Sequence, residues 1–263
     1  VDSDDESRIQ NVGKLKVSDL SFAYSVGNKI YENLSFTAEP GQIIGVTGAV
    51  ACGKSTLGKT FLCESPYEGN ITFDGKELWD MKDDEQTGVI GYLGHDPELF
   101  DDSIKNNVLL GDEADVFTYL KAVCFDEEAG AMEEGVDTIV GNSGVRLSGG
   151  QAQRLALART LCHPKPVLIL DDPFSALDRK TEKEVFQNLK MLAKDSIVMI
   201  LSHRLYLFPE MNQVIWMENG KTVAGTHESI KRDCPEYARL YEVQADEKTE
   251  TQTEGKKGRE ADA

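Results

Sequence analysis

Apolar residues along the chain form short runs separated by polar turns, a pattern typical of a domain that mixes strands and helices. Strand-like segments dominate the first third, and a mixed, largely helical stretch follows from about Asp102 to Thr160. The pattern then returns to β-α alternation from Val167 to Leu201. The first third is therefore expected to form a lobe of strands, for which the candidates are Lys14–Tyr24, Leu34–Ala38, Ile43–Thr47 and Asn70–Phe73.

A glycine-rich sequence, GAVACGKST at Gly48–Thr56, separates an apolar run from a helical pattern. It fits the phosphate-loop pattern G-x-x-x-x-G-K-[ST] in the strand-loop-helix context that this loop requires. Glycines let the backbone curl closely around an anion, so that N–H groups point inward at the start of a helix. Lys54 would add a point charge for the terminal phosphates, and the Ser55 hydroxyl would ligate magnesium. We predict a nucleoside triphosphate site with contacts from Gly48, Cys52, Gly53, Lys54, Ser55 and Thr56.

A second motif, VLILDD at Val167–Asp172, consists of four apolar residues followed by two carboxylates. This is the pattern of a buried parallel strand whose carboxyl end opens onto a ligand crevice. Asp171 is expected to reach the magnesium, directly or through water, and Asp172 to face the attacking water. Paired aspartates after a strand are also a common turn and helix-capping signal, so this motif alone does not decide the function.

The sequence LSGGQ completes a set of motifs through which the chain resembles the nucleotide-binding domains of ATP-binding-cassette (ABC) proteins, especially transporters of the exporter type. Ser148 and Gln151 also form an S-x-x-Q capping box, which predicts a helix N-terminus with free N–H groups and a favourable dipole. In the family this signature closes over ATP bound to a second copy or partner. The signature residues are Leu147, Ser148, Gly149, Gly150 and Gln151.

The resemblance extends from about Leu15 to Val243 and implies an α/β fold: a P-loop NTPase of the ABC ATPase type with a RecA-like core, an N-terminal antiparallel β subdomain and an α-helical signature subdomain. It also implies a closing helix at Cys234–Gln244. The resemblance also implies roles for three single residues, which match the family's motifs in order and spacing. Tyr24 matches the aromatic residue that stacks on adenine, His203 matches the histidine that contacts the γ-phosphate, and Asp178 ends the FSALD loop that crosses the dimer interface.

Two positions depart from the family pattern where hydrolysis occurs. The glutamate that normally acts on the attacking water is Asp172 here, shorter by one methylene or roughly 1.5 Å of reach. A general base must come within about 2.6–3.2 Å of the proton that it takes. The family's glutamine, a magnesium and water ligand, corresponds to His95, for which an ordinary loop residue is the alternative interpretation. We therefore expect a site that holds ATP and turns it over slowly.

Several arrangements of partners fit this interpretation. The chain could be one half of an asymmetric pair whose signature completes a faster site on a different chain, or a homodimer with two slow sites. A nucleotide-gated interaction module with little hydrolysis is the alternative from another class. Soluble ABC proteins of translation or chromosome maintenance form a third option, but those usually show tandem cassettes or coiled-coil insertions, which this chain lacks.

Composition narrows the setting of the domain. The net charge of −18 over 263 residues argues against nucleic-acid binding, and five cysteines without C-x-x-C spacing favour reduced thiols. No apolar run reaches the roughly 18 residues that cross a bilayer. The chain begins at Val1 without methionine, so we expect it to derive from a longer protein with a transmembrane domain, at the cytoplasmic face of a membrane. Residues 1–12 and 244–263 are expected to be flexible, solvated tails.

Overall fold

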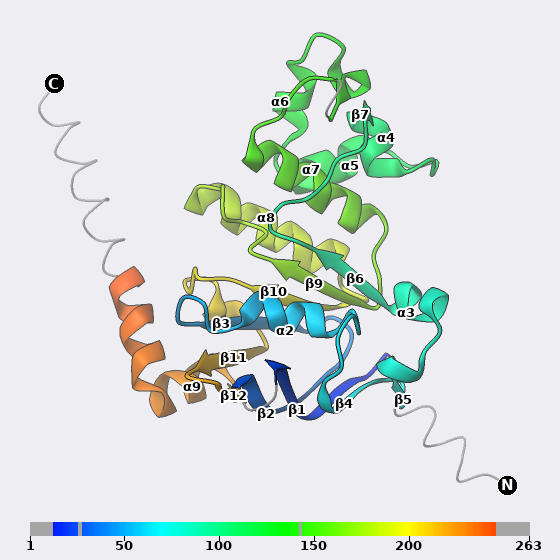
Figure 1. Cartoon of the computed structure of the whole chain (residues 1–263). Helices are drawn as coiled ribbons and strands as arrows, with labels where there is room; N and C mark the ends of the chain where they lie inside the picture. The colour runs from blue at the N-terminus through cyan, green and yellow to red at the C-terminus, as the bar shows by residue number, and fades with distance from the viewer. Residues whose placement is uncertain (1–12, 26–27, 142–143, 246–263) are drawn as a thin grey trace, which may run out of the picture.

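A ten-stranded sheet organises the computed structural model, which describes residues 13–25, 28–141 and 144–245 (Figure 1). The strand order is β5-β4-β1-β2-β12-β11-β3-β10-β9-β6. Strands β5, β4, β1 and β2 pair antiparallel, whereas β11, β3, β10, β9 and β6 pair parallel. The predicted α/β fold with an N-terminal antiparallel subdomain is thus confirmed. The strands are β1 (Leu15–Ser25), β2 (Asn28–Ala38), β3 (Ile43–Gly48), β4 (Glu68–Phe73), β5 (Lys76–Glu77), β6 (Ile90–Leu93), β9 (Val167–Asp171), β10 (Ile197–Leu201), β11 (Gln213–Glu218) and β12 (Lys221–Gly225).

The parallel strands are apolar on both faces because each face is covered. In β9, Leu168 and Leu170 pack in one core and Ile169 packs in the other. Helix α2 and the antiparallel strands cover one face, and α7 and α8 cover the opposite face. The helices are α2 (Lys54–Thr60), α3 (Asp83–Val89), α4 (Ile104–Leu109), α5 (Val116–Ala122), α6 (Asp126–Gly130), α7 (Gly149–Cys162), α8 (Arg179–Leu192) and α9 (His227–Asp233), with 3-10 turns η1 (Leu78–Asp80), η2 (Gly135–Asp137) and η3 (Phe208–Glu210).

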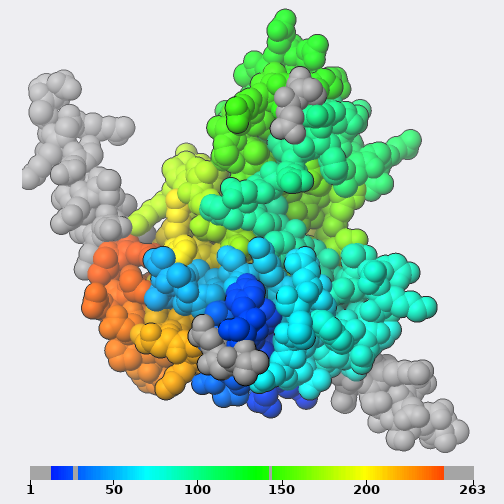
Figure 2. Space-filling model, viewed as in Figure 1, coloured from blue at the N-terminus to red at the C-terminus, as the bar shows by residue number. Residues whose placement is uncertain are grey.

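A helical lobe projects from the sheet and contains α4, α5, α6 and the start of α7 (Figures 1 and 2). Its apolar residues join the core on the α7 face of the sheet. The lobe also holds a short two-stranded sheet of β7 (Asp102–Ser103) and β8 (Ile139–Val140). The largely helical region predicted from Asp102 to Thr160 therefore corresponds to this lobe, with α7 extending two residues further, to Cys162.

The C-terminal part of the described chain is a helix from 235 to 245, drawn in orange in Figures 1 and 2. Tyr237 anchors it, because its buried ring packs edge-on against Trp216 with ring centroids 5.6 Å apart. Gln244 belongs to this helix and not to the polar tail that was predicted to begin there. The remainder of that tail, 246–263, and the predicted tail at 1–12 lie outside the described residues.

Of the helices in the described ranges, none has both the length and the apolar character that a membrane span requires.

Candidate nucleotide-binding site

The phosphate loop connects the end of β3 to the start of α2, as its sequence predicts. Gly53 adopts a φ of 98°, and a Cβ atom there would lie 2.4 Å from the Ile30 side chain. A Cβ atom at Gly48 would lie 2.1 Å from the Met217 carbonyl oxygen. Gly53 is therefore required by its left-handed conformation, and Gly48 by the close approach of the β11 backbone. The loop brings the N-terminus of α2, which no side chain of the described residues caps, to the edge of the sheet.

Lys54 is buried at this N-terminus, with 8% of its surface exposed. Its ammonium donates to the carbonyl oxygens of Gly48 and Ala49, both at 3.4 Å, and Nζ lies 3.8 Å from Sγ of Cys52. The positive charge thus points into the curve of its own loop. Two neutral carbonyl oxygens accept from the ammonium group in this structure. Charged phosphate oxygens would be stronger acceptors for the same group.

The two aspartates predicted to act on magnesium and water lie at the carboxyl end of β9, the strand adjacent to β10. Asp171 ends β9 and is buried, and the Tyr92 hydroxyl donates to its Oδ2 at 3.2 Å. Asp172 adopts a φ of 50°, a left-handed conformation that aspartate tolerates better than most residues. Its N–H donates to the Leu201 carbonyl at 2.8 Å, and the Ser202 hydroxyl approaches its Oδ1 at 3.5 Å. These bonds fix Asp172 against the end of β10.

His203 follows β10 at the same edge of the sheet, because Leu201 pairs with Asp171 in the parallel register. Its side chain and the phosphate loop line one cavity of about 260 Å³. Loss of hydration lowers the pKa of His203, and the Lys54 charge lowers it further, whereas Asp172 and Asp171 act in the opposite direction. The structure therefore brings together Lys54, His203 and the aspartate pair, residues that are far apart in the sequence. The cavity lining consists of Ala51, Cys52, Gly53, Lys54, Ser55, Thr56 and His203.

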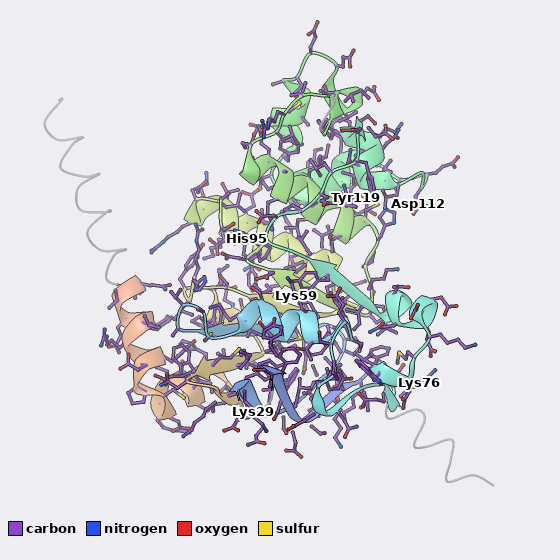
Figure 3. The ribbon with its side chains drawn as sticks, in the orientation of Figure 1. Lys29, Lys59, Lys76, His95, Asp112 and Tyr119 are labelled. Atoms are coloured by element: carbon purple, nitrogen blue, oxygen red, sulfur yellow. The ribbon has the colours of Figure 1, made fainter. Side chains whose placement is uncertain are left out.

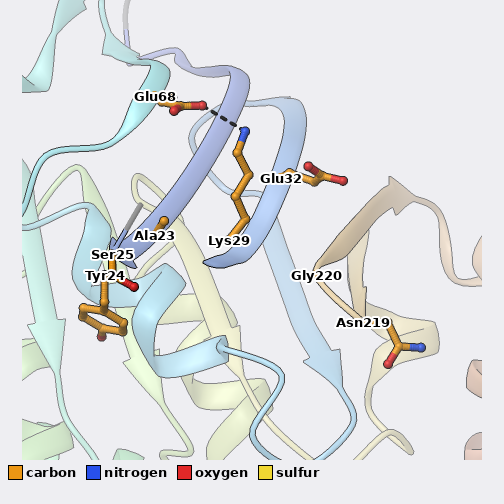
Figure 4. Close-up of a pocket in the computed structure, with 8 residues that line it drawn as sticks. All are labelled: Ala23, Tyr24, Ser25, Lys29, Glu32, Glu68, Asn219 and Gly220. Carbon is orange, nitrogen blue, oxygen red and sulfur yellow. Dashed lines mark hydrogen bonds and ion pairs between the residues drawn. The ribbon is translucent and has the colours of Figure 1, made fainter. Parts of the chain in front are cut away.

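Tyr24 lies at the other side of α2 and is 68% exposed. Its hydroxyl is 3.3 Å from the Thr56 Oγ1, and its ring packs edge-on against Phe22. Tyr24 also borders a larger cavity of about 700 Å³, across which Lys29 forms a 3.0 Å ion pair with Glu68 (Figure 4). An exposed aromatic ring directly beside the phosphate loop is available to stack on a flat ligand group.

His95 lies beyond the end of β6 and is exposed (Figure 3). Leu93 pairs with Leu170 in parallel register, so His95 and Asp171 are at the same edge of the sheet. Among the described residues, however, His95 forms no hydrogen bond or ion pair with either aspartate. The structure brings His95 near the site only through its backbone position.

The signature helix begins as its capping box predicts. The Ser148 Oγ accepts from the Gln151 N–H at 3.3 Å, and the Gln151 Oε1 accepts from the Ser148 N–H at 2.9 Å. The Gln151 Nε2 donates to Glu128 at 2.8 Å, and a Cβ atom at Gly150 would meet Ala176 at 2.8 Å. Because α7 and α2 cover opposite faces of the sheet, the signature does not face the phosphate loop of its own chain.

Asp178 caps α8. Its Oδ1 accepts from the N–H groups of Lys180 at 2.9 Å and Thr181 at 3.1 Å, and its Oδ2 accepts from the Thr181 hydroxyl at 2.7 Å. These hydrogen bonds, led by that of the Thr181 side chain, lower the pKa of Asp178. The side chain is exposed, so it remains accessible while it caps the helix.

Sequence reasoning missed the residues that orient the predicted ones. Tyr92 holds Asp171, and Ser202 approaches Asp172. The Gln244 side chain bonds the backbone on both sides of Arg204. These residues lie within or beside the predicted motifs and the predicted closing helix, but nothing in their local sequence signals the distant groups that they contact.

Fold and site together define a P-loop nucleotide-binding domain. A family model described as ABC transporter matches residues 31–175, which is more than half of the chain. The chain therefore belongs to the ABC transporter family, and it corresponds to the ATPase domain of that family.

Individual relatives are much longer than this chain. P-glycoprotein 14 of Caenorhabditis elegans is 35% identical over 246 residues, which cover 90% of this chain and 18% of that protein. The probable multidrug resistance ABC transporter ATP-binding/permease protein YheI of Bacillus subtilis is 34% identical over 243 residues, covering 90% and 42%, respectively. A solved structure of a bacterial Atm1-family ABC exporter with ATP bound superposes with a TM-score of 0.80 at 28% identity, covering 89% of this chain and 42% of that one. The chain thus spans less than half the length of each.

Proposed function

We propose that this chain binds ATP with magnesium and hydrolyses it within a dimer of nucleotide-binding domains, and that this cycle drives a membrane-embedded transport domain. The observation that carries the proposal is that Lys54 and His203 line one cavity at the end of the parallel strands, with Asp172 close enough for its charge to act on His203. Ligands of open α/β sheets bind at this edge. The reaction is in-line transfer of the γ-phosphoryl group to water, in which catalysis consists mainly of positioning and charge stabilisation.

Phosphate binding is assigned to the loop and to Lys54. The Lys54 ammonium exchanges its two 3.4 Å bonds to backbone carbonyls for charge-assisted bonds to the terminal phosphates. The N–H groups at the start of α2 add a favourable dipole. The exposed Tyr24 ring stacks on the adenine, which supports a preference for ATP without hydrogen bonds to the base.

Two oxygen donors at the site fit magnesium. Mg²⁺ is usually held by one or two carboxylates together with substrate phosphates and waters. The Asp171 carboxylate and the Ser55 hydroxyl provide oxygen ligands, and Tyr92 occupies only Oδ2 of Asp171. When bound, magnesium neutralises charge on the phosphates. We assign His95 to the same group of magnesium ligands, which requires its exposed side chain to turn toward Asp171 when magnesium binds.

Asp172 is assigned to the attacking water and His203 to the γ-phosphate. The contact with the Ser202 hydroxyl and the backbone bond to Leu201 hold the Asp172 carboxyl at the end of β10. A carboxylate one methylene shorter than glutamate and held in this way reaches the water poorly, which supports slow turnover at this site.

A second nucleotide-binding domain is needed to complete each site. Ser148 and Gly149 are exposed at the N-terminus of α7, a suitable surface for an anion, yet they lie across the sheet from α2. In a head-to-tail dimer this surface meets the γ-phosphate held by the other domain. Asp178, in the loop before α8, is exposed beside it and is assigned to the dimer interface.

The helical lobe is assigned to docking of the membrane domain, which would place this chain at the cytoplasmic face. Three large apolar side chains, Phe100, Ile139 and Val145, are 57%, 44% and 50% exposed. Their backbones are close together, because the Val145 N–H donates to the Ile139 carbonyl at 2.8 Å and the Phe100 carbonyl lies beside Gly141, while the Phe100 ring packs against the Arg159 guanidinium. A groove of about 410 Å³ runs alongside, lined by Pro97, Glu98, Leu99, Gly141, Arg146, Leu147 and Ala152. Exposed apolar side chains beside a groove with charged and apolar lining suit a protein partner.

Steady-state ATP hydrolysis by the purified chain over a range of protein concentrations tests the proposal, with Lys54→Ala as the blank. Tight ATP binding with little turnover in the chain alone, and turnover that rises when a partner domain is added, are expected. A rate that rises faster than linearly with concentration of this chain alone would indicate a competent homodimer and contradict the slow site. Absence of ATP binding by the unsubstituted chain would overturn the proposal as a whole.

A further inference from the structure

The C-terminal helix is connected to the loop that carries His203, although the two are far apart in the sequence. We propose that Gln244 is a positioning residue for His203, so that the last described turn of the chain controls how well the site recognises the γ-phosphate. This inference rests on the proposed function, since it assumes that His203 contacts that phosphate.

Gln244 uses both atoms of its side-chain amide on this loop. Its Nε2 donates to the His203 carbonyl at 2.8 Å, and its Oε1 accepts from the Leu205 N–H at 2.8 Å. The glutamine therefore bridges the backbone on either side of Arg204 in a way that only an amide can, with one donor and one acceptor. The two bonds fix the peptide planes on either side of Arg204, and the first of these planes begins at the His203 carbonyl.

Arg204 holds the same loop through a second set of contacts. Its guanidinium donates to the carbonyls of Leu177 at 2.6 Å and Ser175 at 2.8 Å, and it pairs at 2.6 Å with Glu182, which is 1% exposed. The loop after β10 is thus fixed both to α8 with the segment before it and to Gln244. With Arg204 anchored, loss of Gln244 leaves the loop in place while the His203 peptide gains freedom.

The connection also reaches the segment that ends at Asp178. The Arg179 guanidinium donates to the Gln244 carbonyl at 3.2 Å, so the helix end touches the first residue of α8. A shift of the helix end would therefore act on both His203 and the neighbourhood of Asp178. Through these contacts the C-terminal helix can affect both His203, which is assigned to the γ-phosphate, and Asp178, which is assigned to the dimer interface.

The test compares the affinities of ATP and ADP for the full chain in the presence of Mg²⁺, because only ATP has the γ-phosphate. Gln244→Ala is expected to weaken ATP binding about fivefold, the loss expected of one or two hydrogen bonds, and to leave ADP binding unchanged. Gln244→Glu keeps the acceptor for Leu205 but lacks the donor for His203, so it is expected to show most of the same selective loss. Val243→Ala, on the exposed side of the same turn, is the matched control and should change neither affinity.

His203→Ala separates the possible failures. If His203 reads the γ-phosphate, this variant also loses ATP affinity selectively, and adding Gln244→Ala to it produces no further loss. Equal losses for ATP and ADP in Gln244→Ala, or no loss in either, would overturn the inference even when His203→Ala is selective. An unchanged ATP to ADP ratio in His203→Ala would instead remove the assumption about His203, and no binding of either nucleotide by the unsubstituted chain would remove the proposed function itself.

Discussion

The Tyr92 hydroxyl donates a 3.2 Å hydrogen bond to Oδ2 of Asp171, and thereby joins the end of β6 to the end of β9. Burial raises the pKa of Tyr92, and the Asp171 charge raises it further, so the hydroxyl keeps its proton and remains a donor. One carboxylate oxygen of Asp171 is thus bonded and oriented by the protein itself, and in the proposed function the other oxygen binds magnesium. Preorganisation of this kind lowers the cost of binding.

Removal of that hydroxyl is expected to weaken the response to magnesium. In Tyr92→Phe the Asp171 carboxylate loses its orienting bond, worth about 1 kcal/mol, which corresponds to a roughly fivefold higher Mg²⁺ concentration for half-maximal ATP binding. A magnesium titration of ATP binding measures this. Tyr67→Phe is the matched control, since it removes a tyrosine bond to Glu77 in the antiparallel lobe. A shift of equal size in the control would mean that the effect is not specific to Asp171.

Lengthening the carboxylate at position 172 is expected to accelerate hydrolysis. Asp172→Glu restores one methylene of reach toward the attacking water, and a well-placed general base contributes at least about 100-fold. We expect kcat of the chain mixed with a partner domain to rise about tenfold, with KM little changed. The φ of 50° at this position suits aspartate better than glutamate, so the same variant is expected to have a lower melting temperature.

The control for this prediction is Asp172→Asn, which keeps the shape of the side chain and removes its basicity. It is expected to lower kcat below that of the unsubstituted chain. If Asp172→Glu and Asp172→Asn have the same kcat, the carboxylate at this position does not limit turnover, and another step, such as product release, controls the rate.

Cys52 should report occupancy of the phosphate loop. Its Sγ lies 3.8 Å from the Lys54 ammonium, and it lines the same cavity as His203. Because the thiol sits at a helix N-terminus beside a positive charge, we expect alkylation that bound ATP slows about tenfold. Mass spectrometry of individual cysteines measures the rates. Cys63 is the internal control, because it lies outside the phosphate loop and burial raises the pKa of its thiol. Equal Cys52 labelling with and without ATP would contradict this expectation.

The features that could be predicted from the sequence are those formed by residues close together along the chain. The phosphate loop around Lys54 and the capping box of Ser148 and Gln151 are set by neighbours within a few positions, so their patterns identify them directly. The bond from Tyr92 to Asp171 spans 79 positions, and that from Gln244 to His203 spans 41. Such contacts arise from strand order and helix docking, and no local pattern encodes them.

Acidification is expected to destabilise the docked C-terminal helix through His227. This side chain is buried, its Nδ1 lies 2.7 Å from the Tyr237 hydroxyl, and its ring packs against Tyr237 and Tyr241. Burial lowers the pKa of His227 below its usual value of 6.5, an effect that Glu228 opposes and Lys231 reinforces. The unfolded chain therefore takes up the proton first as the pH falls, so the free energy of unfolding is highest above pH 6.5 and decreases below it.

Denaturant unfolding between about pH 7.5 and pH 5 measures this loss. His227→Gln cannot take up a proton and should show a smaller decrease across that range, at the cost of lower stability at pH 7.5. Because the pKa of His203 is also lowered, His203→Gln serves as the comparison, and both substitutions together should flatten the profile further. An unchanged pH slope in His227→Gln would mean that this histidine takes up its proton equally in the folded and unfolded chains, and that its contact with Tyr237 does not depend on its neutral form.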